Sequence, residues 1–130
     1  MFKVEYPGAQ SLAEEGEQAA YRARIEPLVE LFQHKGSSEC RNGFSLSPAA
    51  PDELCEFEQI GSPNKEDCLA ESGVGGIIDL GCISRLDFVR EALKEGLREE
   101  QRIGANPFKW GLIGSTDTHS GTPNDMDKNS

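Results

Sequence analysis

The feature that most restricts the folds open to this chain is a capped amphipathic helix followed closely by a short apolar strand. Ser84 and Asp87 have the spacing of a capping box, which predicts a helix over residues 85–103. Residues 110–114 are mostly apolar and predict a strand. The expected apolar stripe of the helix comprises Leu86, Val89, Leu93 and Leu97, with Phe88 and Ala92 beside them. Three opposite-charge pairs support the helix: Glu91/Lys94, Glu95/Arg98 and Glu99/Arg102.

A second helix and a second strand are expected near the start of the chain. Ser11 and Glu14 form another capping-box pattern, so a helix is expected over residues 11–26. Residues 28–33 are nearly all apolar, which indicates a strand covered on both faces in a parallel sheet. Residues 34–82 are rich in Gly, Ser and Pro and are expected to be an irregular loop region. Strand, long connection with helices, strand is the pattern of an α/β protein.

The composition is that of one acidic domain, or a piece of one, over residues 1–130. The formal net charge of -10 argues against nucleic acid and against anionic membrane surfaces as partners. No apolar run approaches the roughly 20 residues that span a bilayer. The start of the chain lacks the apolar core of a signal peptide, which slightly favours a cytoplasmic location. Residues 121–130 are polar and are expected to form a frayed tail.

The four cysteines stand at positions 40, 55, 68 and 82, and no two of them form a Cys-x-x-Cys motif. This spacing disfavours a structural zinc site. Four cysteines allow three disulfide pairings, among which the sequence does not choose. Without an export signal we expect free thiols. The alternative is one bridge between Cys40 and Cys55.

Asp117 and His119 are the strongest candidates for chemistry. They follow the expected strand at residues 110–114, and residues two apart in extended backbone point to the same side. A carboxylate and an imidazole in this arrangement suit zinc, manganese or iron. They suit an acid/base pair as well. The alternative is a polar turn whose side chains hydrogen-bond to the backbone.

Glu30 is the second candidate, because it interrupts the apolar strand at residues 28–33. A carboxylate inside an apolar strand is costly unless it is paired, hydrogen-bonded or bound to a cation. Leu28, Glu30 and Phe32 share one face of the strand. If that face points inward, Glu30 is a candidate metal ligand. The alternative is an edge-strand glutamate that faces water.

The segment after this strand brings together several polar side chains. His34, Lys35, Ser37 and Glu39 lie where a parallel strand ends, which is where ligand-binding loops occur in such sheets. Lys35 and the serines are suited to an anionic group such as phosphate. The alternative for each residue is a solvated surface loop.

Three segments together resemble a known family. They are VELFQHKGSSEC at 29–40, DELCEFE at 52–58 and VREALKEGLREEQRIGANPFKWGLIGSTDTHSGTP at 89–123. The chain resembles the domain-of-unknown-function family 3604, whose members are similar to the polymerase-and-histidinol-phosphatase (PHP) metal-dependent phosphoesterases. The resemblance covers most of residues 25–123 and is densest at its end.

The resemblance implies a partial, distorted β/α fold, PHP-like and related to the TIM barrel, that binds divalent ions. Glu30, Asp117 and His119 correspond to metal ligands of that pattern. His34 is a weaker candidate, because it is one position away from where related sequences carry a histidine. Lys35, Ser37 and Glu39 are then weak candidates for substrate contacts. The opening His-x-His motif of the family is missing, so the chain resembles only the later part of a family member.

The functional prediction is therefore a fragment of a PHP-like, metal-dependent hydrolase, in particular a phosphoesterase. In the complete protein it would hold zinc, manganese or iron and act on a small molecule or phosphoester. This chain alone is expected to bind metal weakly or not at all and to be inactive. The alternative is a non-catalytic α/β domain for interaction or oligomerisation, associating through exposed strand edges. A weaker third hypothesis is a redox-responsive protein that uses the four cysteines.

Overall fold

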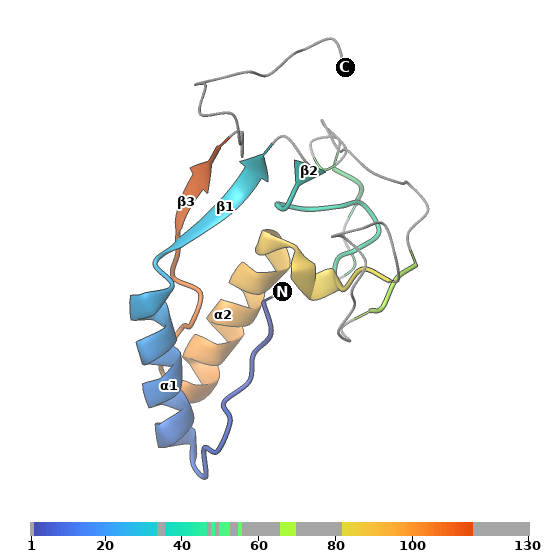
Figure 1. Ribbon diagram of the computed structural model, residues 1–130. Helices are drawn as coiled ribbons and strands as arrows, with labels where there is room; N and C mark the ends of the chain where they lie inside the picture. The colour runs from blue at the N-terminus through green and yellow to red at the C-terminus, as the bar shows by residue number, and fades with distance from the viewer. Residues whose placement is uncertain are drawn as a thin grey trace.

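The computed structural model describes residues 2–33, 36–46, 48, 50–52, 55, 66–69 and 82–115. These residues form a small α/β arrangement, as the sequence predicts (Figure 1). Along the chain the elements are α1 (Leu12–Ile25), β1 (Leu28–Gln33), β2 (Gly36–Ser37), the 3₁₀ turn η2 (Arg85–Asp87), α2 (Val89–Ile103) and β3 (Gly111–Gly114). In this part of the chain no helix has the length and apolar character needed to cross a membrane.

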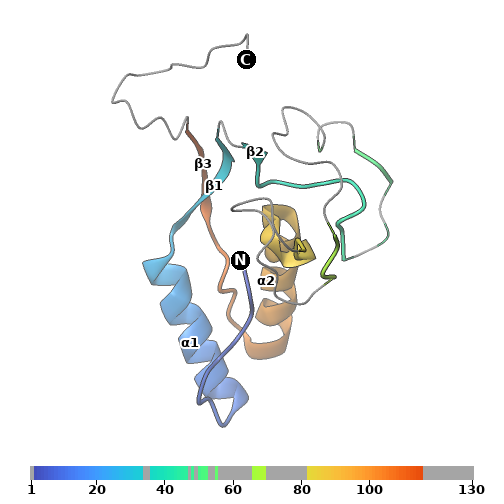
Figure 2. The same ribbon diagram turned by 45° about the vertical axis from the view of Figure 1, so that its right-hand side comes forward.

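The sheet has the strand order β2-β1-β3, so β1 is the central strand. β1 and β3 are parallel, and β2 pairs with the end of β1 in the antiparallel sense. Glu30 is in register with Ile113, and one step later Phe32 is in register with Gly114. Leu31 is therefore an extra residue in β1, which makes a β-bulge directly after Glu30. In both views the carboxyl ends of β1 and β3 point to the same edge of the sheet (Figures 1 and 2).

Helix α1 extends beyond the opposite end of these strands, and α2, which begins beside the segment after β2, runs next to α1 (Figures 1 and 2). They approach closely because α1 carries Gly16 at the crossing. A Cβ atom at Gly16 would lie 2.9 Å from the carbonyl oxygen of Ile103 in α2. At the end of α2, Gly104 adopts the left-handed conformation that terminates a helix (φ +74°).

The N-terminal arm, residues 2–10, packs along the helices rather than being loose. The Phe2 N–H donates to the Leu86 carbonyl oxygen at 3.3 Å, and the Tyr6 hydroxyl donates to Glu99 Oε2 at 2.9 Å. Burial and this bond to Glu99 raise the pKa of the Tyr6 phenol. The Gln18 side chain of α1 donates to the Pro7 carbonyl oxygen at 3.2 Å. The arm thus joins α1, α2 and η2.

The core centres on Phe108, which is 1% exposed. Its ring lies 4.8 Å from the Trp110 ring and 6.4 Å from the Phe2 ring, between centroids. The Arg22 guanidinium covers it at 4.8 Å. On α2 the buried residues are Val89, Glu91, Ala92, Gly96 and Glu99. The expected apolar stripe is wrong at Leu97, which is 58% exposed, because the buried face runs through Gly96 instead.

The element boundaries follow the predictions closely. Ser11 caps α1 by accepting the Glu14 N–H, although the Glu14 carboxylate accepts from the Gln10 N–H and not from Ser11. Residues 28–33 form β1 as predicted. The helix predicted over residues 85–103 is divided, because Phe88 is extended between η2 and α2. The Ser84/Asp87 capping box and all three ion pairs on α2 are confirmed.

Exposed apolar side chains lie on both faces of the parallel strands in the described part of the chain, because Leu28 and Ile113 are on one face and Leu112 is on the other. Val29 is buried, but Leu28 is 58% exposed, Leu112 52% and Ile113 45%. The prediction that β1 is covered on both faces is therefore wrong for these residues. The described helices pack mainly against each other, so they leave these side chains uncovered.

The cysteines form two disulfides, Cys40–Cys55 and Cys68–Cys82. The expectation of free thiols is wrong, and the alternative bridge between Cys40 and Cys55 is correct. The fold brings the paired Cα atoms to 5.1 and 5.2 Å, within the range that a disulfide requires. Disulfides of this kind are typical of proteins that fold in an oxidising compartment.

Candidate functional site

The carboxyl edge of the parallel strands holds the one predicted ligand that the structure describes fully, Glu30. It lies on the central strand of the sheet, so it is not an edge-strand glutamate. Its face of the strand is nonetheless open to solvent, as that alternative expected, because the contact with Ser115 is exposed and Leu28 and Ile113 on the same face are 58% and 45% exposed. Ser115 follows β3 at the same edge, and its hydroxyl donates to Glu30 Oε1. The parallel pairing of β1 and β3 therefore joins residues that are 85 positions apart in the sequence.

Glu30 differs in its partners from the other glutamates of the described chain. Each of the others that is at least partly buried forms an ion pair with arginine or lysine: Glu15, Glu39, Glu91, Glu95, Glu99 and Glu100. Within the described ranges Glu30 has the neutral Ser115 hydroxyl and no such cation. A carboxylate that no arginine or lysine neutralises keeps its negative charge available to a bound cation.

The other predicted site residues are placed only in part. Asp117, His119, His34 and Lys35 lie outside the described residues. The backbone of Ser37 belongs to β2, opposite Phe32. Among the described residues no three His, Cys, Asp or Glu side chains are grouped as a metal site. In the sequence, Asp117 and His119 follow Ser115 by two and four positions.

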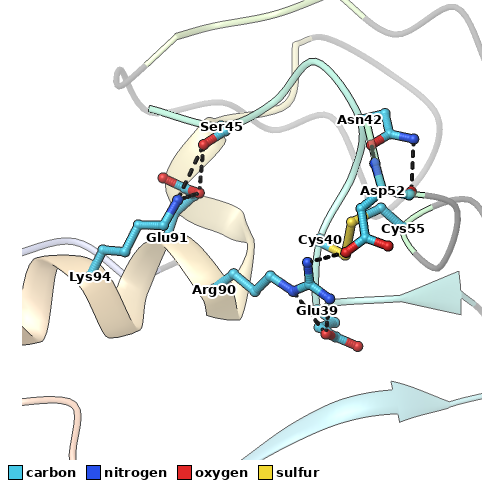
Figure 3. A network of polar contacts seen from close by, with 9 residues as sticks. All are labelled: Glu39, Cys40, Asn42, Ser45, Asp52, Cys55, Arg90, Glu91 and Lys94. Carbon is cyan, nitrogen blue, oxygen red and sulfur yellow. Dashed lines mark hydrogen bonds and ion pairs between the residues drawn. A yellow bond between two sulfur atoms is a disulfide. The ribbon is translucent and has the colours of Figure 1, made fainter. Parts of the chain in front are cut away.

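Glu39, the remaining predicted contact, takes part in a polar network at the start of α2 (Figure 3). The first turn of α2 has no side-chain cap, and its first two N–H groups donate to backbone carbonyl groups of the segment after β2. The Val89 N–H donates to the Ser38 carbonyl oxygen at 2.9 Å, and the Arg90 N–H donates to the Glu39 carbonyl oxygen at 3.1 Å. This segment is thereby attached to the helix.

Arg90 connects two parts of the loop (Figure 3). Its guanidinium donates to Glu39 Oε1 through Nε and Nη2 at 2.8 and 2.6 Å, and to Asp52 Oδ2 through Nη1 at 2.6 Å. The Cys40–Cys55 disulfide closes the loop beside this pair. Asn42 also binds the backbone of Asp52 through two hydrogen bonds. Its Nδ2 donates to the Asp52 carbonyl oxygen at 3.0 Å, and its Oδ1 accepts from the Asp52 N–H at 2.9 Å.

Glu91 anchors the other side of the same loop (Figure 3). It is 4% exposed and accepts from the Ser45 hydroxyl and the Leu46 N–H, both at 2.9 Å, and from Lys94 Nζ at 2.6 Å. Burial raises the pKa of Glu91, but the bonds from Lys94, Leu46 and Ser45 outweigh burial and leave the pKa below its usual range.

A cavity of about 480 Å³ lies between this loop and α2. Its size is within the range of ligand pockets, roughly 300–1,000 Å³. Each charged side chain described in its lining already has a partner: Arg41 lies over Phe44, Arg85 binds Asp67, Lys94 binds Glu91, and Arg90 binds Asp52. We interpret the network as the support that fixes the loop to α2. Sequence reasoning missed it apart from the Glu91/Lys94 pair.

Comparison with known proteins gives one finding. The sequence matches the family described as "Protein of unknown function (DUF3604)" over residues 1–130. None of the curated proteins and none of the solved structures is significantly similar to the chain. The match confirms the first part of the resemblance seen in the sequence, while the link to PHP phosphoesterases stays a prediction. This chain belongs to the DUF3604 family.

Proposed function

We propose that this chain supplies part of the metal centre of a PHP-like, metal-dependent hydrolase, with Glu30, Asp117 and His119 as ligands. The observation that carries the proposal is the environment of Glu30. It is a solvent-accessible carboxylate at the carboxyl edge of two parallel strands, without a cationic partner among the described residues. It contacts Ser115, which precedes the Asp-x-His motif by two positions.

The three ligand types define the chemistry that the centre would support. Two carboxylates and an imidazole suit zinc, manganese or iron. Such an ion lowers the pKa of bound water and stabilises negative charge on a phosphoester or amide-like substrate. His34 is a weaker ligand candidate in this proposal. Lys35 and Ser37 would contact the anionic part of the substrate, whereas the ion pair of Glu39 with Arg90 favours a supporting role for Glu39.

The proposal includes a larger β/α sheet around this site. β1 and β3 expose Leu28, Leu112 and Ile113, as strands do when the layers that would cover them are not among the described elements. With three ligands in this chain, metal binding is expected to be weak, because affinity depends on the number of ligands. The isolated chain is therefore expected to have little hydrolytic activity.

A calorimetric titration with Zn²⁺ and Mn²⁺ tests the proposal. We expect binding by the wild-type chain that is lost in Asp117→Ala and strongly weakened in Glu30→Gln. The matched control is Glu17→Gln, which removes an exposed carboxylate from α1 and is expected to leave binding unchanged. Equal binding by wild type and Asp117→Ala would contradict the proposal.

A second candidate function, a non-catalytic association domain, is favoured by the exposure of β3. All four residues of this strand are exposed, and β3 is the outer strand of the described sheet. Exposed strand edges with apolar side chains promote pairing between chains. If the chain is an association domain, we expect light scattering to show a dimer for the purified wild-type chain and a monomer for Ile113→Lys. Metal binding would then be indifferent to Asp117→Ala.

A further inference from the structure

We propose that the Cys40–Cys55 disulfide is a redox switch that controls how its loop is attached to α2, and that Arg90 sets the equilibrium of this switch. The bridge and the Arg90 side chain connect the same two parts of the loop (Figure 3). The switch is independent of the proposed metal site. It narrows the hypothesis of a redox-responsive protein from four cysteines to one bridge.

The covalent and the ionic connections lie close together in the chain. Glu39 directly precedes Cys40, and Asp52 precedes Cys55 by three positions. The Arg90 guanidinium, in the first turn of α2, binds a carboxylate oxygen of Glu39 and one of Asp52, each at 2.6 Å. A disulfide and two ion pairs therefore join the same chain segments.

Connections that join the same segments stabilise each other. Closing a disulfide costs the entropy of bringing the two ends of its loop together. While Arg90 binds both carboxylates, these ends are already close, so the sulfur atoms react at a higher effective concentration. By linkage, the closed bridge strengthens the contacts of Arg90 by the same factor. Two partly exposed ion pairs together correspond to about a 3- to 10-fold change in an equilibrium constant.

The cavity beside the loop gives a small reductant a route to the bridge. Cys40 and Cys55 both line this cavity of about 480 Å³, whose size suits a small organic molecule. The two cysteines are only 7% and 4% exposed, so we expect a small dithiol to approach the sulfur atoms from the cavity. The dithiol supplies two electrons and two protons: the Sγ–Sγ bond breaks, both cysteines become thiols, and the dithiol becomes a cyclic disulfide. The Asp52 end of the loop is then released from its covalent link.

Mixtures of reduced and oxidised dithiothreitol measure the equilibrium of each bridge in the whole chain. After alkylation of the thiols, mass spectrometry gives the open fraction of Cys40–Cys55 and of Cys68–Cys82 at each ratio of reduced to oxidised reagent. We expect Cys40–Cys55 to open while circular dichroism still shows the helices. In Arg90→Gln, the ratio at which this bridge is half open should fall by about 3- to 10-fold.

Two controls distinguish this effect from a general loss of stability. Arg98→Gln removes an arginine from the same helix, where its partner is Glu95, and should leave both bridges at their wild-type ratios. The Cys68–Cys82 bridge of the Arg90→Gln variant is the second control. It should not shift, because Arg90 pairs with carboxylates beside the other bridge.

Hydrogen exchange reports whether the loop is released when the bridge opens. The Asp52 N–H donates to Asn42 Oδ1 at 2.9 Å, and we expect its protection to be lost in the reduced protein. The Glu26 N–H, which donates to the Arg22 carbonyl oxygen at the end of α1, should keep its exchange rate.

Four results would overturn the proposal. They are an unchanged half-open ratio in Arg90→Gln, an equal shift of the Cys68–Cys82 bridge, loss of the helices whenever Cys40–Cys55 opens, and protection of the Asp52 N–H that persists after reduction.

Discussion

Replacing Gly96 by alanine is expected to destabilise the protein, although glycine to alanine in a helix normally does the opposite. In an ordinary helix interior the change stabilises by about 0.5–1 kcal/mol. Gly96 is buried in the middle of α2, and a Cβ atom there would lie 2.3 Å from Asn106 Oδ1 and 3.0 Å from Asn106 Cγ. The Asn106 side chain would have to move.

Asn106 cannot move without loss. Its Oδ1 accepts the Phe108 N–H at 2.8 Å, which holds the turn that places Phe108 in the core. An unsatisfied N–H costs about 1–3 kcal/mol. After subtraction of the gain in helix propensity, Gly96→Ala should lower the free energy of unfolding by about 1–2 kcal/mol.

Whether Gly96→Ala stabilises or destabilises the protein should depend on the side chain at position 106. In Asn106→Ala the clash is absent, so adding Gly96→Ala should stabilise by about 0.5–1 kcal/mol. Gly104→Ala is a useful contrast: no atom lies near its Cβ position, and its cost of about 1–2 kcal/mol comes from the left-handed backbone alone. That cost should be the same with or without Asn106.

Urea unfolding under non-reducing conditions measures these differences. The single tryptophan, Trp110, reports directly because its ring contacts those of Phe108 and Phe2. A stability increase in Gly96→Ala alone would refute the reasoning. So would an effect of Gly96→Ala that is the same with and without Asn106.

Three further predictions concern the core, the loop and pH. Phe108→Ala removes an almost fully buried ring and should lower the free energy of unfolding by about 3–5 kcal/mol, measured in urea. Replacing Cys40 and Cys55 together by serine should cost about 3 kcal/mol, the typical value for a loop of about 15 residues, measured by calorimetric melting. The pKa of Glu91 is lower in the folded protein, so its contribution to stability is complete above the ordinary glutamate pKa of about 4.3 and is lost as pH falls below it; Glu91→Gln should flatten the acid side of a stability–pH curve.

Each of these has a result that contradicts it. A small effect of Phe108→Ala would mean that the aromatic cluster is not the main core. For the disulfide, wild type and the double serine variant should have equal stability in dithiothreitol, because both bridges are then open in both proteins, and a remaining difference would show that the serine replacements themselves cause the loss. If the free energy of unfolding falls with decreasing pH in the same way for Glu91→Gln and wild type, other carboxylates dominate the acid sensitivity.

Much of the local structure could be predicted because it depends on neighbours in the sequence. Ser11 and Ser84 cap helix starts through groups within three residues, and the ion pairs of α2 are three residues apart. The strand at 28–33 was equally clear from its apolar run. The predicted helix over 85–103 failed only at Phe88, where the chain must turn to bring η2 against the N-terminal arm.

The candidate site was predictable in its residue types but not in its partners. Glu30 stood out because a carboxylate is costly inside an apolar strand. Its contact with Ser115 depends on the parallel register of β1 and β3 and on the bulge at Leu31. The sequence contains no sign of either, because register is set by pairing between distant segments.

The sequence by itself determined the two long helices, the strands β1 and β3 and the acidic residue within β1, because spacing and capping act over a few residues, whereas β2 formed in a region expected to be irregular. Only the tertiary structure decided the disulfide pairing, the Arg90 bridge between Glu39 and Asp52, and the neutral partner of Glu30. Each of these joins residues that the chain alone keeps well apart. These interactions depend on charges, sulfur atoms and hydroxyl groups being close in space. Residues at many different sequence separations can meet that requirement, so the sequence does not specify which pairs form.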